Sequence, residues 1–81
     1  MSDMIAEAAG EVFGEICALF ENDPERLSVL NGWRNARRTG KIPFSEKDDE
    51  VLIAAMEKYR RGGNIEDLYK SVENIVKRMK R

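Results

Sequence analysis

Histidine is absent from this chain of 81 residues, and cysteine occurs once, at Cys17. Without histidine the chain lacks the commonest general base and the commonest metal ligand of proteins. A single thiol cannot form a disulfide within the chain, which favours a reducing compartment such as the cytoplasm. Cys17 lies in an apolar row of a predicted helix, so we interpret it as a buried structural thiol. The sequence therefore predicts no enzyme activity, no bound metal and no cofactor.

Long apolar runs are missing as well. None approaches the ~20 residues that a membrane-spanning helix requires, and the first residues lack the basic and then apolar pattern of a signal peptide. Repeats, low-complexity stretches and strand-like alternation are also absent. Apolar residues make up 42% and charged residues 36% of the chain, which is typical of a charged helical domain and too apolar for disorder. We therefore expect one helical domain over residues 1–81, with no membrane partner.

Apolar spacing and helix-end signals predict an all-α fold, a compact bundle of four helices. The helices are expected at about residues 3–21, 24–38, 46–61 and 65–80. Ser45 and Asp48 form a capping-box pattern before the third helix, and Gly62 is a natural left-handed stop after it. The connection that follows is so short that the last two helices should form an antiparallel hairpin. In the second helix, Asn31-Gly32 marks a point where the helix could break.

Two glycines lie inside the first predicted helix, at Gly10 and Gly14, where each costs about 1 kcal/mol relative to alanine. Their spacing of four residues aligns them with Ala6 and Ala18, in what we call the small-residue row. Such a row leaves one edge of a helix almost free of side chains and lets another helix approach closely. Three arrangements remain open: the row packs against a helix of the same chain, packs against a second copy in a homodimer, or faces solvent.

An acidic row runs beside the small residues on the same helix. It consists of Asp3, Glu7, Glu11 and Glu15. Carboxylates at this spacing could bind a hard cation such as Mg²⁺ or Ca²⁺, but like charges four residues apart also repel one another. We favour a solvated face that is answered by arginine or lysine from the second helix or from a partner. The two rows together form the candidate interaction surface.

The basic segment 33–41 is the part of the chain most like a nucleic-acid contact. Its candidate residues are Trp33, Arg34, Arg37, Arg38 and Lys41. The cations would neutralise phosphates, and Trp33 could stack on an unpaired base. Alternatively, Trp33 belongs to the core, its neighbouring arginines pair with the acidic first helix, and Arg37 lies over the indole ring. The net charge of −1 and the acidic first helix weigh against nucleic acid.

Charge alternates along the chain in four blocks. Residues 1–25 carry −7, residues 26–45 carry +5, residues 46–58 carry −3 and residues 59–81 carry +4. Blocks of alternating sign predict segments that attract one another or a complementary partner.

We therefore predict a small non-enzymatic helical module for protein–protein interaction or regulation, which self-associates through its first helix. Its partner would be another protein or a second copy of itself. The alternative is a nucleic-acid-binding accessory protein that uses segment 33–41 and the basic C-terminal residues. These residues are Lys77, Arg78, Lys80 and Arg81, which also complement the dipole at a helix end.

Overall fold

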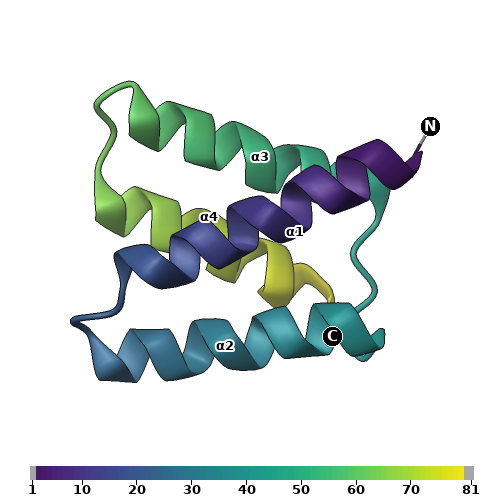
Figure 1. The fold of residues 1–81 in the computed structure, drawn as a ribbon, viewed down its shortest axis with the longest axis horizontal. Coiled ribbons are helices and arrows are strands. Elements are labelled where there is room, and N and C mark those ends of the chain that lie inside the picture. The colour runs from purple at the N-terminus through teal and green to yellow at the C-terminus, as the bar shows by residue number, and fades with distance from the viewer. Residues whose placement is uncertain (1, 80–81) are drawn as a thin grey trace.

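The computed structural model describes residues 2–79, with side chains from Met4 onward. The chain forms four helices, and the described residues contain no strand (Figure 1). The helices are α1 (Ser2–Leu19), α2 (Pro24–Thr39), α3 (Glu46–Arg60) and α4 (Ile65–Met79). The all-α prediction is confirmed, and every predicted helix has its counterpart. The predicted end of the last helix, Lys80, lies outside the described residues.

The first helix ends at Leu19, two residues before the predicted end at 21. The chain then tightens into a turn, in which the Phe20 backbone N–H donates to the Cys17 carbonyl at 3.1 Å. Asp23 caps the next helix, because its side chain accepts a hydrogen bond from the Arg26 backbone N–H at 3.3 Å. α2 then continues without interruption through Asn31-Gly32, where the sequence allowed a break. This turn sends α2 back beside α1 (Figure 1).

The connection from α3 to α4 is built from two glycines and a capping asparagine. Gly62 has a φ of 105°, the left-handed conformation predicted for it. At Gly63 a Cβ atom would lie 2.8 Å from the Lys58 carbonyl oxygen, so no side chain fits without moving backbone. The Asn64 side chain accepts from the Glu66 backbone N–H at 2.7 Å and starts α4. The turn lays α4 back against α3, and the predicted hairpin is confirmed (Figure 1).

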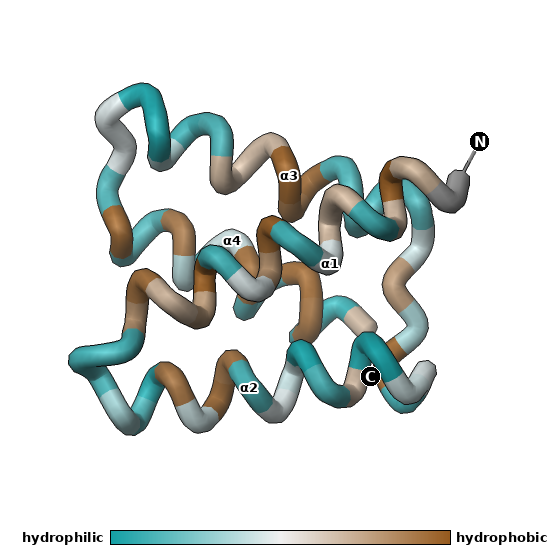
Figure 2. The backbone as a smooth tube through the Cα atoms, viewed as in Figure 1, coloured by the Kyte–Doolittle hydropathy of each residue, from teal (hydrophilic) through white to brown (hydrophobic). Residues whose placement is uncertain are grey.

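The core lies between α1, α3 and α4, where their hydrophobic segments meet in the middle of the molecule (Figure 2). The largest fully buried side chains are Phe13, Ile16, Leu30, Leu52, Leu68, Ile75, Val72 and Val76. α2 contributes only Leu30 to this set, with Leu27 and Trp33 packed partly against the core. α2 is also attached to the other helices by polar contacts of Arg26 and Arg37. No helix of the described residues is long and apolar enough to cross a membrane.

Candidate interaction surface

The two central members of the small-residue row face arginine side chains of α2. A Cβ atom at Gly14 would lie 3.1 Å from an Nη atom of Arg34, and one at Gly10 would lie 3.6 Å from an Nη atom of Arg37. The space beside the two glycines is therefore occupied by guanidinium groups of α2 and not by the α2 backbone. The outer members of the row, Ala6 and Ala18, are exposed.

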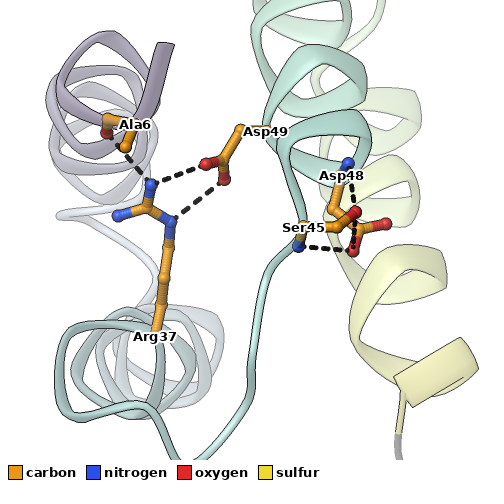
Figure 3. Close-up of polar contacts among 5 residues, drawn as sticks. All are labelled: Ala6, Arg37, Ser45, Asp48 and Asp49. Carbon is orange, nitrogen blue, oxygen red and sulfur yellow. Dashed lines mark hydrogen bonds and ion pairs between the residues drawn. The ribbon is translucent and has the colours of Figure 1, made fainter. Parts of the chain in front are cut away.

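Arg37 links three helices through its guanidinium group (Figure 3). Its Nε donates to one carboxylate oxygen of Asp49 in α3 at 3.2 Å, and an Nη donates to the other at 3.1 Å. The same Nη also donates to the Ala6 carbonyl oxygen of α1 at 3.0 Å. The Arg37 side chain is 15% exposed and that of Asp49 is 6% exposed. A paired, nearly buried guanidinium of this kind has a structural role.

Arg37 contacts a different carboxylate and a different aromatic ring from those that the sequence suggested. Its carboxylate partner belongs to α3 and not to the acidic first helix. The aromatic ring beneath it is Phe44, whose centroid lies 5.6 Å from Cζ, and not Trp33. The physical reason is that Asp49 draws the guanidinium into the gap between α1 and α3, away from the indole. Asp49 was missed as a site residue, although its spacing from Leu52 and Met56 places it on the buried face of α3.

A second arginine holds the opposite end of α2. Arg26 donates two hydrogen bonds to the Glu66 carboxylate of α4, each 2.7 Å long. These bonds lower the pKa of the Glu66 carboxyl below its ordinary value, against a smaller opposing effect of desolvation. The Arg26 guanidinium also lies over the Tyr69 ring, 4.8 Å from its centroid. Arginine–carboxylate pairs therefore attach α2 near both of its ends.

Trp33 is turned inward and takes part in an aromatic cluster. Its ring centroid lies 5.8 Å from that of Tyr69, which in turn lies 5.6 Å from that of Phe20. This packing supports the interpretation of Trp33 as a core residue. The indole packs against the Tyr69 ring at an interplanar angle of 34° and is partly exposed.

One residue of the acidic row forms an ion pair with another helix, and two others are exposed on α1. Glu15 pairs with Arg60 of α3, whereas Glu7 and Glu11 are exposed on α1. The side chain of Asp3 lies outside the described residues. Within the described part of the chain, no group of three or more His, Cys, Asp or Glu side chains is placed to hold a metal ion.

An open groove of about 520 Å³ lies between α1 and α2, and we call it the charged groove. Glu7 and Glu11 line its α1 side, and Arg34 and Arg38 line its α2 side, with Arg37 between them. Gly10 and Phe13 complete the lining from α1. Among the described residues, no ion pair within 4.0 Å joins the acids of one side to Arg34 or Arg38. The groove thus brings Glu7 and Glu11 of the acidic row together with Arg34 and Arg38 of the basic segment, and all four of these residues are exposed.

The described C-terminal bases lie on another face, formed by α3 and α4. Lys77 is 3.6 Å from the Glu73 carboxylate and Arg78 is 3.9 Å from that of Asp48. Lys80 and Arg81 lie outside the described residues. Lys77 and Arg78 are therefore partly neutralised by the fold and do not extend the basic side of the charged groove.

Cys17 is 5% exposed, as its apolar row predicted. Burial raises the pKa of its thiol, and the nearby Arg34 opposes this only in part. The thiol therefore stays protonated at neutral pH, which suits a structural residue and not a nucleophile.

Comparisons with models of protein families, with curated proteins and with solved structures find no match to this chain. Any function must therefore be inferred from the residues and contacts of the chain itself.

Proposed function

We propose that this chain is a small non-enzymatic module for protein–protein interaction, and that it self-associates through α1. The observation that carries the proposal is the charged groove, which is open and lined by exposed charges of both signs, with Gly10 between them. The exposed face of α1 adds Met4, 78% exposed, and the small Ala8. Methionine and arginine are enriched at protein–protein interfaces, and charges of opposite sign across an interface fix its register.

The absence of histidine supports the non-enzymatic part of the proposal. Activation of Ser, Cys or Thr as a nucleophile commonly relies on an adjacent imidazole base. The single thiol, Cys17, is buried, and burial raises its pKa, which disfavours the thiolate form that a nucleophile requires.

Sedimentation equilibrium over about 1–500 µM protein tests self-association, because this range brackets micromolar affinities. We expect a monomer–dimer equilibrium that weakens when Gly10→Leu places a large side chain in the groove. Gly32→Leu is the matched control, since Gly32 is an exposed helical glycine with no other atom within 4 Å of its would-be Cβ. A strict monomer throughout the range, with or without these changes, contradicts the proposal.

Nucleic-acid binding is a second candidate, favoured by the exposed cations Arg34, Arg38 and Lys41. Against it, Arg37 is paired with Asp49, and acids line the opposite side of the groove. A gel-shift series with duplex DNA, single strands and RNA at low salt is the test. A shift that is lost in Arg34→Ala plus Arg38→Ala, with a salt slope of about 2 or more, would promote this candidate. Absence of a shift at low salt would remove it.

A further inference from the structure

The two sides of the charged groove carry charges of opposite sign along the same stretch of its length. The contacts of Gly10 with Arg37 and of Gly14 with Arg34 fix an antiparallel register between α1 and α2. In this register Glu7 and Glu11 face the same stretch of the groove as Arg34 and Arg38. These acids and bases do not pair with one another, because no ion pair within 4.0 Å crosses the groove in the described part of the chain.

Two acids on one side and two bases on the other make the groove complementary to itself. A two-fold rotation about an axis along the groove exchanges its sides, so each acidic side comes to face a basic side. A rotation about an axis across the groove would instead bring like charges together. Dimers of identical chains are most often two-fold and use the same surface on both partners. The charge pattern thus selects one of the two symmetric arrangements.

We propose that two copies of this chain pair face to face at the charged groove, about a two-fold axis that runs along it. Glu7 and Glu11 of each copy then lie opposite Arg34 and Arg38 of the other copy. This geometry rests on the proposed self-association and specifies how it occurs. Gly10 lies in the lining of the groove and adds no side chain of its own between the two copies.

A second copy fits the groove better than a partner of one charge sign. A purely acidic partner, including nucleic acid, is repelled by Glu7 and Glu11, and a purely basic one is repelled by Arg34 and Arg38. The second copy presents both signs in the required positions. Since exposed ion pairs are screened by salt, the dimer should dissociate more readily at high ionic strength.

Charge reversal followed by mixing tests this geometry. One variant combines Glu7→Lys with Glu11→Lys, and the other combines Arg34→Glu with Arg38→Glu. Each variant alone should dimerise at least about tenfold more weakly than the wild-type chain, because its attractive pairs become repulsive. A one-to-one mixture should form the heterodimer with an affinity within about threefold of the wild-type dimer, because all facing charges are then of opposite sign.

The heterodimer recovers attraction on both sides of the groove. The lysines of the first variant face the glutamates of the second, while the unchanged arginines face the unchanged acids. Both halves of the heterodimer are therefore attractive, which neither homodimer achieves. Sedimentation with one variant labelled by a fluorophore measures all three affinities at 50 mM and 500 mM NaCl.

Glu46→Lys plus Glu50→Lys is the matched control, since both acids are exposed on α3 and neither lines the charged groove. It changes net charge as the first variant does and should leave dimerisation within about threefold of wild type. Circular dichroism checks that each variant is folded. Should a reversed variant not fold, the neutral pair Glu7→Gln plus Glu11→Gln, read with the salt dependence of the wild-type chain, tests the same contacts.

The outcomes separate this geometry from the proposed function. If the wild-type chain dimerises but reversal has no effect, or mixing restores nothing, the geometry is overturned and self-association stands. If the wild-type chain is monomeric at 500 µM and 50 mM NaCl, both are overturned. Restoration by mixing, together with an unaffected control, supports both.

Discussion

Replacing Gly10 with alanine should stabilise the fold and weaken self-association at the same time. Glycine in a helix interior is about 1 kcal/mol less favourable than alanine. The new methyl group would lie 3.6 Å from Arg37, which is an ordinary van der Waals distance, so nearly all of this gain should be kept. At Gly14 the distance to Arg34 is 3.1 Å, but the neighbour is the far end of an exposed side chain that can move. Gly14→Ala should therefore gain somewhat less, about 0.5 kcal/mol.

Urea unfolding followed by circular dichroism at about 2 µM protein measures the effect on the monomer, because dimerisation at higher concentration would add stability by mass action. For a domain of this size a gain of about 1 kcal/mol corresponds to a rise in Tm of roughly 4–8 °C. Gly32→Ala should give a similar gain, since nothing lies near its would-be Cβ. Gly63→Ala should destabilise, because its Cβ would meet the Lys58 carbonyl oxygen at 2.8 Å.

Self-association provides the second half of this prediction. The methyl group at Gly10 raises the floor of the charged groove, so the dimer dissociation constant should increase, whereas Gly32→Ala should leave it unchanged. A loss of fold stability in Gly10→Ala would refute the spacing between α1 and the Arg37 side chain from which the gain was calculated. A gain in both stability and dimer affinity would instead exclude the groove as the dimer interface.

Three other predictions concern single contacts. Asp49→Ala leaves the nearly buried charge of Arg37 without its partner and should lower the free energy of unfolding by about 3 kcal/mol in urea titrations. Arg37→Met combined with Asp49→Leu removes both charges and should restore most of the lost stability. Arg26 lowers the pKa of Glu66 in the folded chain below its value in the unfolded chain. The Glu66 carboxylate therefore stabilises the fold at pH values above its unfolded-state pKa, and this stabilisation is lost as the pH falls through its lower folded-state pKa. Glu66→Gln should flatten that acid-side decline, and an unchanged pH profile would contradict the contact. Cys17 should react with a thiol reagent at least about tenfold more slowly in the folded chain than in urea, and equal rates would contradict its burial.

The helices could be predicted because their signals are local. Ser45 and Asp48 form the capping box that their spacing predicted, with backbone-to-side-chain hydrogen bonds of 3.1 and 3.0 Å. Gly40 and Gly62 adopt positive φ at helix ends, as expected of glycines there. The sequence left one point open where distant segments decide the outcome. The second helix could have broken at Asn31-Gly32, yet it is anchored near both ends to other helices and stays continuous.

The contacts that the candidate residues make could not be predicted from the sequence. The small-residue row, the acids and the basic segment were all identified from spacing, and Glu7, Glu11, Arg34 and Arg38 do line one groove. The spacing could not assign Arg37 to Asp49, since that choice depends on how α2 lies across α1 and α3. It also could not show that guanidinium groups, and not a helix backbone, occupy the space beside the glycines.

Caps and apolar periodicity act within a few residues, so the sequence alone predicts four helices and their approximate ends. The packing of the helices determines which charged side chains pair with another helix and which are left without such a pair. Glu15, Arg26 and Arg37 are engaged by other helices, whereas Glu7 and Arg34 are left on the two sides of a groove. The reason is physical: an ion pair forms between groups a few ångströms apart, and such separations are fixed by the packing of helices distant in the chain.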